Sequence, residues 1–222
     1  FGGCAAGQEG AYAEKIAVSA AIINAKPDTV SHVDIAALSL IGLTALVSVE
    51  DTLELRTGET ILIHGGAGGV ASFAIQVAKH IGAHVITTAR QANHDYLRGL
   101  GADEIIDYTT QDFTAVVSDC DAVLDTVGGE VTQRSFAVLK PGGRAAFITS
   151  GSIPPDSPRA DVTSLRPRVG RDREHLERIL ELLEAGAVAA PEIRRFPLSA
   201  VKEAQAISES RHLRGKLVLE MA

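Results

Sequence analysis

The fold is decided by residues 60–81, which read TILIHGGAGGVASFAIQVAKHI. Thr60–His64 is a short apolar run with the length of a buried strand. Residues 68–81 carry apolar side chains at helical spacing. The glycine-rich segment HGGAGGVA joins the two. A strand, a glycine loop and a helix in direct succession are the context in which a loop binds the phosphates of a dinucleotide.

The spacing of the small residues assigns a task to each of them. In the pattern G-x-G-x-x-A, Gly66 is expected to make the tight turn, and Gly68 lets the backbone approach a diphosphate. Ala71 takes the position where the helix packs closely on the strand. The free amides and the positive dipole end of the helix would then hold the diphosphate. The alternative is a glycine-rich turn that binds nothing.

Working outward, short apolar runs alternate with helical patterns. We expect further strands at residues 84–88, 104–107, 121–125, 144–149 and 162–165, and helices at 93–100, 172–185 and 199–210. Alternation at this spacing predicts βαβ units, a parallel sheet and therefore the α/β class. The glycine loop between a strand and a helix further indicates a doubly wound parallel sheet of the Rossmann type.

The two ends of the chain do not continue this alternation. Residues 11–16 resemble a strand, and a closing strand is expected at 216–219. We therefore predict a second, mostly antiparallel unit built from both ends. The expected division is a remnant of a second domain at 1–30, the nucleotide-binding domain with its leading helix at 31–188, and a C-terminal return at 189–222. Because the chain opens as if in the middle of a domain, we expect that an N-terminal portion precedes it in the natural protein.

The end of the second strand predicts which nucleotide is bound. A site for NAD usually places Asp or Glu there, about 20 residues after the glycines, to bind the ribose hydroxyls. The chain has Thr87, Thr88, Ala89 and Arg90 at that point. A guanidinium is a planar, permanently charged partner for a phosphate. The sequence therefore favours NADPH, with Arg90 on its 2′-phosphate. In the alternative interpretation, Arg90 lies in a surface turn.

Composition excludes several classes of protein. The net charge of the 222-residue chain is -7 and no long basic run occurs, so we expect no nucleic-acid partner. The two cysteines exclude a disulfide framework and a four-cysteine zinc site. We find no apolar stretch of the roughly 18 residues that a membrane span requires, and no signal peptide. No membrane association and a cytoplasmic location are the expectations.

Further motifs connect the chain to a known family. They are residues 10–14 (GAYAE), 42–45 (GLTA), 61–79, 100–103 (LGAD), 106–108 (IDY), 125–129 (DTVGG), 139–144 (LKPGGR) and 214–219 (RGKLVL). In these stretches the chain resembles the zinc-independent quinone oxidoreductase branch of the medium-chain dehydrogenase/reductase (MDR) superfamily. One departure is Ala71, where close relatives generally carry a third glycine. We expect cofactor binding to survive this methyl group.

The resemblance implies a Rossmann domain inserted into a GroES-like, mostly β catalytic domain, and it implies a set of cofactor contacts. Thr44 would lie near the nicotinamide, residues 66–70 on the diphosphate, Val127 beside a ribose, and Lys216 near the phosphates. Tyr108 would lie beside the adenosine end, with Arg90 on the adenosine phosphate. The backbone of residues 148–150 would meet the carboxamide. In full, the expected cofactor-binding residues are Thr44, Gly66, Ala67, Gly68, Gly69, Val70, Thr88, Arg90, Tyr108, Val127, Ile148, Thr149, Ser150 and Lys216.

The implied chemistry is hydride transfer from NADPH to a quinone or an α,β-unsaturated carbonyl. Zinc-dependent relatives carry a cysteine ligand near residues 40–42, which is absent here, so no metal is expected. No general acid can be assigned, and Asp125 at a strand end is expected to cap a turn rather than to catalyse. An enoyl-thioester reductase, a non-catalytic NADPH-binding protein and a dimerisation unit remain alternatives. The resemblance also implies a homodimer through an edge strand at 162–165, where unpaired backbone groups invite a second copy.

Overall fold

A computed structural model describes residues 1–3, 10–149, 151, 153–210 and 212–221 of the chain. The chain divides into two compact units. One comprises Thr44–Val169, and the other combines Phe1–Leu43 with Gly170–Ala222. The domain division expected from the sequence, at residues 31 and 189, stays a prediction.

The unit Thr44–Val169 contains a six-stranded sheet in the order β3-β2-β1-β4-β5-β6, in which every neighbouring pair is parallel. The strands are β1 (Thr60–His64), β2 (His84–Ala89), β3 (Glu104–Asp107), β4 (Cys120–Asp125), β5 (Leu139–Phe147) and β6 (Thr163–Leu165). Apolar runs of this kind are buried on both faces of a parallel sheet. The predicted α/β fold of the Rossmann type is confirmed.

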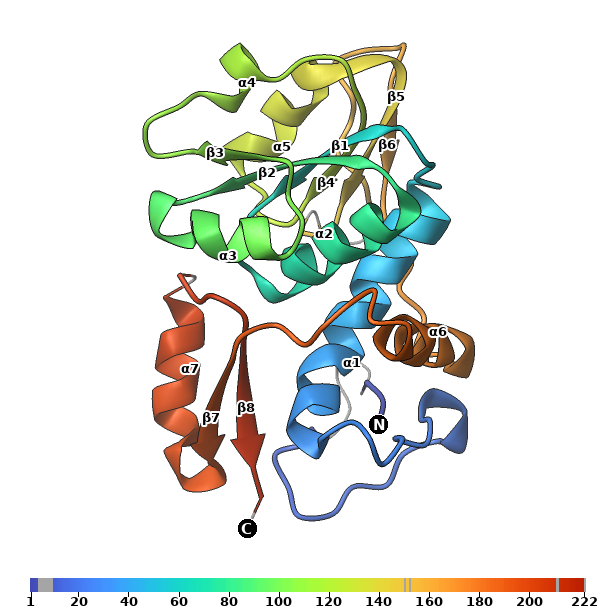
Figure 1. The fold of residues 1–222 in the computed structure, drawn as a ribbon, viewed down its shortest axis with the longest axis vertical. Helices are drawn as coiled ribbons and strands as arrows, with labels where there is room; N and C mark the ends of the chain where they lie inside the picture. The colour runs from blue at the N-terminus through green and yellow to red at the C-terminus, as the bar shows by residue number, and fades with distance from the viewer. Residues whose placement is uncertain (4–9, 150, 152, 211, 222) are drawn as a thin grey trace. The chain divides into compact units, whose positions relative to one another are not determined.

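Helices cover both faces of this sheet. They are α2 (Gly69–Ile81), α3 (His94–Gly99), α4 (Phe113–Val116) and α5 (Glu130–Ser135), with the 3₁₀ turns η3 (Gln91–Asn93) and η4 (Phe136–Val138). Figure 1 shows α2 and α3 on one face and α4 and α5 on the other. Helix α2 ends at Gly82, whose φ of 91° gives the left-handed cap that glycine adopts most easily. Phe136 in η4 and Phe147 in β5 are fully buried, with ring centroids 5.3 Å apart.

A long apolar helix leads into the sheet. It consists of α1 (His32–Leu46) and the π-helical segment η2 (Val47–Thr52). Together, these 21 residues are long and apolar enough to cross a membrane by length and composition. Our expectation that no stretch reaches that length is therefore wrong. In the most apolar window of the helix, 67% of the residues are buried inside the protein, which is the environment of a core helix that is apolar on all sides.

The other unit contains a second, smaller sheet. Besides the first part of α1, this unit contains η1 (Ala20–Ile22), α6 (Arg173–Glu184), β7 (Ile193–Pro197), η5 (Leu198–Ala200), α7 (Val201–Glu209) and β8 (Lys216–Glu220). Strands β7 and β8 pair in parallel, so the antiparallel pairing expected for this segment is wrong. The physical reason is the connection: α7 packs against both strands as a helical crossover, and parallel strands need such a crossover.

The strand expected at residues 11–16 is also wrong. These residues form no strand, and their side chains are exposed, with Tyr12 at 62%. A strand requires a partner for its backbone groups. Among the described residues at this end of the chain, the antiparallel bridge joins Gly2 to Ile23 instead.

Candidate functional site

The candidate site lies at the carboxyl ends of the central strands. After β3 the chain returns to the other side of β1, so the strand order reverses between β1 and β4. Ligands of open α/β sheets bind at such a reversal point, beyond the carboxyl ends of the strands. His64 at the end of β1 is in register with Asp125 at the end of β4. The glycine loop follows His64, and the segment Thr126 to Gly129 follows Asp125.

The glycine loop is packed too closely for side chains. A Cβ atom on Gly66 would lie 2.3 Å from Thr87 Oγ1, and one on Gly65 would lie 2.9 Å from Thr126 Oγ1. The left-handed residue is Gly65, with a φ of 74°. The Gly68 amide donates to the Gly65 carbonyl and closes a turn in which Gly66 is the second residue, so Gly66 lies in the tight turn to which the sequence pattern assigned it. Gly66 is needed for close approach to Thr87 and not for its backbone angle.

The loop is held from inside by the protein. The Gly65 amide donates to Thr88 Oγ1 (3.1 Å), the Gly66 amide to the Thr88 carbonyl (3.0 Å), and the Gly68 amide to the Gly65 carbonyl (2.9 Å). Gly68 is the N-cap of α2, which begins at Gly69. The first amides of a helix have no partner inside it, and they lie at the positive end of its dipole. A bare backbone surface with outward amides fits the diphosphate of a dinucleotide.

Two residues expected at the adenosine end lie in contact. Arg90 follows β2 and Tyr108 follows β3, and Arg90 Nε donates to the Tyr108 hydroxyl at 2.9 Å. Both side chains are exposed. The contact holds the guanidinium beside the end of β2, where a ribose phosphate would lie. Thr88 differs from them because it is only 4% exposed and its hydroxyl is directed inward.

The segment after β4 is organised by Asp125, which is completely buried. One carboxylate oxygen accepts the amides of Val127 (2.8 Å) and Gly128 (2.9 Å), and the other accepts the Thr132 hydroxyl (2.6 Å). The prediction that Asp125 caps this turn is confirmed. Val127 is held at the surface with 49% of its area exposed.

The other residues that were expected to contact the cofactor lie in different parts of the chain. The Ile148 amide donates to the Asp125 carbonyl (3.2 Å), and Thr149 lies against Gly128, so both lie beside the turn after β4. Ser150 lies outside the described residues. The Thr44 carbonyl accepts the Ser48 hydroxyl at 2.6 Å. Lys216 opens β8 in the other unit, where burial lowers the pKa of its ammonium group. The roles expected for these residues stay predictions.

The sequence assigned no specific role to His64, which the structure places directly before the glycine loop. Its ring is 1% exposed, and Nδ1 lies 3.2 Å from Thr88 Oγ1. Burial lowers the pKa of His64 to about 4, so the ring is neutral near pH 7. A signal was present in the sequence, because His64 is the polar residue that ends an apolar strand directly before the glycines.

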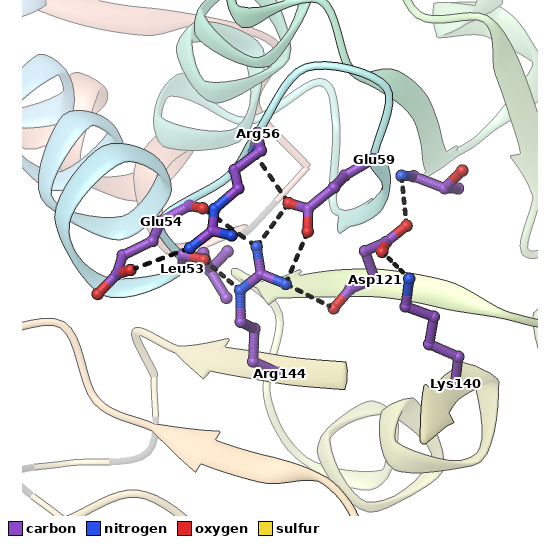
Figure 2. Close-up of polar contacts among 8 residues, drawn as sticks. Leu53, Glu54, Arg56, Glu59, Asp121, Lys140 and Arg144 are labelled. Atoms are coloured by element: carbon purple, nitrogen blue, oxygen red, sulfur yellow. Dashed lines mark hydrogen bonds and ion pairs between the residues drawn. The ribbon is translucent and has the colours of Figure 1, made fainter. Parts of the chain in front are cut away.

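A second polar cluster lies at the opposite side of the sheet, near the amino-terminal ends of the central strands (Figure 2). The Arg144 guanidinium donates to the Leu53 and Glu54 carbonyls and to the Glu59 carboxylate, which it approaches to 2.6 Å. Burial alone would raise the pKa of Glu59, but the hydrogen bonds and the charge of Arg144 outweigh burial and hold it below its usual value. These groups bond to one another, so we assign the cluster to stability and not to ligand binding.

Over the described part of the chain, no group of three or more His, Cys, Asp or Glu side chains is placed to hold a metal ion. The expectation of a zinc-free site stays a prediction.

Comparison with known proteins agrees with this geometry. The chain is 35% identical to the 2-methylene-furan-3-one reductase of Solanum lycopersicum, over 96% of the chain and 53% of that protein. It is similar to the solved quinone oxidoreductase from Coxiella burnetii (33% identity, TM-score 0.81, 89% of this chain and 63% of that one). It is also similar to the CurK enoyl reductase (28% identity, TM-score 0.81, 90% and 65%). The chain thus spans roughly half to two-thirds of the length of these relatives.

The family model for zinc-binding dehydrogenases matches residues 100–219, which is more than half of the chain. This match covers strands β3 to β6 of the parallel sheet and continues into β8. Together with the relatives above, it shows that the chain belongs to the zinc-binding dehydrogenase family of the medium-chain dehydrogenase/reductase superfamily.

Proposed function

We propose that the chain is the nucleotide-binding part of an NADPH-dependent, zinc-independent oxidoreductase. Its substrate is a small quinone or α,β-unsaturated carbonyl compound. The observation that carries the proposal is the glycine loop at the strand-order reversal, with Arg90 held by Tyr108 one strand away. The relatives support the substrate class, because their names include a furanone reductase and a quinone oxidoreductase.

The residues of the chain bind and orient the cofactor. Residues Gly66 to Val70 and the first turn of α2 hold the diphosphate, and Val127 borders a ribose. The backbone of residues 148–149 meets the carboxamide, and Thr44 lies near the nicotinamide. When bound, NADPH supplies a hydride to the electrophilic carbon of the substrate. The negative charge that develops on the substrate oxygen is stabilised by hydrogen bonds, and we assign no general acid to this chain.

The preference for NADPH over NADH rests on charge. The end of β2 carries no carboxylate that would repel a 2′-phosphate, and Arg90 offers a permanent positive charge there. Tyr108 holds the guanidinium through Nε.

The test is a fluorescence titration of the chain with NADPH and NADH, repeated on Arg90→Ala. NADPH should bind more tightly than NADH to the wild type. In Arg90→Ala the NADPH affinity should fall roughly 10- to 100-fold, because a hydrogen bond to a charged group is lost, while the NADH affinity stays unchanged. Arg98→Ala is the matched control. It removes an exposed arginine of α3, which pairs with Asp95 in the same helix. Failure of the wild type to bind either nucleotide would overturn the proposal.

Activity assays separate the alternatives. Turnover of enoyl thioesters in preference to enones and quinones would indicate an enoyl-thioester reductase, and the similar CurK structure is an enoyl reductase by name. In the full-length protein, NADPH binding without consumption against any of the three would indicate a non-catalytic binding protein or a dimerisation unit. The cytoplasmic location is also part of the proposal.

We also propose a homodimer formed through β6. This strand ends the sheet and pairs with β5 on one side, so its other edge is available to a second copy. Thr163→Pro should convert the dimer to a monomer in light scattering, because proline removes a backbone donor and fixes φ. Thr163→Ala keeps the backbone and should remain dimeric. A dimer that persists in Thr163→Pro would overturn this assignment.

A further inference from the structure

Directly behind the glycine loop lies a buried polar pair, His64 and Thr88. Thr88 is 4% exposed and His64 is 1% exposed. The pair joins the ends of two neighbouring strands, since His64 closes β1 and Thr88 is the penultimate residue of β2. His64 Nδ1 and Thr88 Oγ1 are 3.2 Å apart. Polar side chains are seldom buried unless they form hydrogen bonds, because the loss of hydration costs free energy.

Thr88 contacts the loop twice, at consecutive amides. Its hydroxyl oxygen accepts the Gly65 amide at 3.1 Å, and its carbonyl accepts the Gly66 amide at 3.0 Å. These are the two residues that turn the chain from β1 towards the start of α2. The orientation of Thr88 therefore decides how the peptide planes of the loop are turned. Because the hydroxyl faces inward, Thr88 acts on a bound nucleotide through the loop and not by direct contact.

His64 in turn fixes the orientation of the Thr88 hydroxyl. The Gly65 amide occupies one acceptor position of Thr88 Oγ1, which leaves one donor and one acceptor position. The neutral imidazole can complete either of them with Nδ1, depending on the tautomer. The pKa of about 4 keeps the ring neutral, although Asp125 favours its charged form and Arg134 opposes it. The ring packs edge-on against Phe113, with centroids 4.6 Å apart.

The two ring nitrogens of His64 differ in their hydrogen bonding. His64 Nε2 is buried and has no hydrogen-bond partner within the described structure. An unpartnered buried nitrogen costs stability, and an apolar residue in this place would avoid that cost. The polar function of His64 thus lies at Nδ1, on the side of the loop.

We propose that His64 and Thr88 are positioning residues for the glycine loop, and that they set its affinity for the diphosphate that NADPH and NADH share. This rests on the proposed function, because it presumes that the loop binds a dinucleotide. It differs from the role of Arg90, which acts on the one phosphate that distinguishes the two nucleotides. The pair determines how tightly a dinucleotide binds, and Arg90 determines which one.

The experiment titrates NADPH and NADH against the full chain carrying His64→Asn, His64→Gln, Thr88→Ser or Thr88→Val. Asparagine keeps a polar atom at the place of Nδ1, whereas glutamine places its amide near Nε2. We expect His64→Gln and Thr88→Val to weaken both nucleotides equally, about tenfold, as the loss of one hydrogen bond predicts. His64→Asn and Thr88→Ser should stay within about threefold of the wild type because they keep the contact. Serine restores the hydroxyl that valine lacks.

The double variant His64→Gln/Thr88→Val tests whether the two residues act as one unit. We expect a loss close to that of either single variant, about tenfold and not a hundredfold, because residues in one network are not additive. Val138→Ala is the control for general destabilisation. It trims a core side chain that is 1% exposed, and it should lower the melting temperature without changing nucleotide affinity.

Each outcome decides between the claims. If the wild type binds neither nucleotide, the proposed function fails and the positioning role with it. If the wild type binds but His64→Gln and Thr88→Val bind equally well, only the positioning role is overturned. Additive losses, or losses that follow the melting temperature as in Val138→Ala, would also overturn it. A change in the ratio of NADPH to NADH affinity would place the pair at the adenosine phosphate instead.

Discussion

Gly66→Ala is expected to weaken NADPH binding by about a hundredfold, more than any other single substitution in the loop. The new Cβ would lie 2.3 Å from Thr87 Oγ1 and 3.1 Å from Leu97 Cδ2. Thr87 cannot move aside easily, because it is fully buried and its hydroxyl donates to the Ile63 carbonyl at 2.7 Å. Overpacking of this kind costs about 1–3 kcal/mol, and here the loop would have to move because Thr87 cannot. The amides would therefore be displaced from the diphosphate.

Two variants make this prediction specific. Gly99→Ala adds a methyl group in α3 where nothing lies within 4 Å, and it should bind NADPH like the wild type. Thr87→Ala in the Gly66→Ala background removes the hydroxyl that the new Cβ meets, and it should restore part of the affinity. Affinities are measured by fluorescence titration. A Gly66→Ala chain that binds within about threefold of the wild type would show that the loop does not carry the diphosphate.

Arg144→Met is expected to lower the free energy of unfolding by about 3 kcal/mol, the largest stability effect among the polar side chains in Figure 2. The side chains of Arg144 and Glu59 are each 20% exposed, so the loss of one charge leaves the other poorly hydrated. The same guanidinium bonds the carbonyls of Leu53 and Glu54. Glu54 has a φ of 44°, which a residue other than glycine adopts at some cost, and Arg144 helps to hold it. Urea unfolding measures the effect.

Arg56→Met is the matched control for Arg144. It removes the same charge from the same cluster, but the Arg56–Glu54 pair is 76% and 72% exposed, with 3.8 Å between the charged atoms. Exposed pairs of this kind contribute about 0–1 kcal/mol, so Arg56→Met should unfold almost like the wild type. Equal losses in the two variants would contradict our reading of the cluster.

Acid should reduce the difference between wild type and Arg144→Met. The pKa of Glu59 is lower in the folded chain than its usual value of 4.5. The contribution of its carboxylate is therefore present above that value and is lost as the pH falls through the folded pKa. Unfolding curves at several pH values between neutral and acid would show the two proteins converging, and a constant difference would contradict the assignment to Glu59.

Local patterns in the sequence determined the sheet and the position of the site. Strand β1 has the predicted bounds Thr60–His64, and the other predicted strands of the parallel sheet occur within one residue of their expected bounds, except β5, which spans Leu139–Phe147 instead of 144–149. Apolar runs and helical periodicity are properties of neighbouring residues, so they can be read without knowledge of the fold. The glycine loop was predictable for the same reason, as was the capping role of Asp125 after a strand.

The tertiary structure alone decided which residues meet. Arg90 and Tyr108 were both expected at the adenosine end, but only the pairing of β2 with β3 brings them into contact. His64 was missed because its partner Thr88 is 24 residues away, and Arg144 because Leu53 is 91 residues away. Likewise, the parallel pairing of β7 with β8 and the left-handed turn at Gly65 depend on what packs against them. Periodicity records which face of a segment is apolar, whereas partners distant along the chain are chosen by the packing of the whole fold.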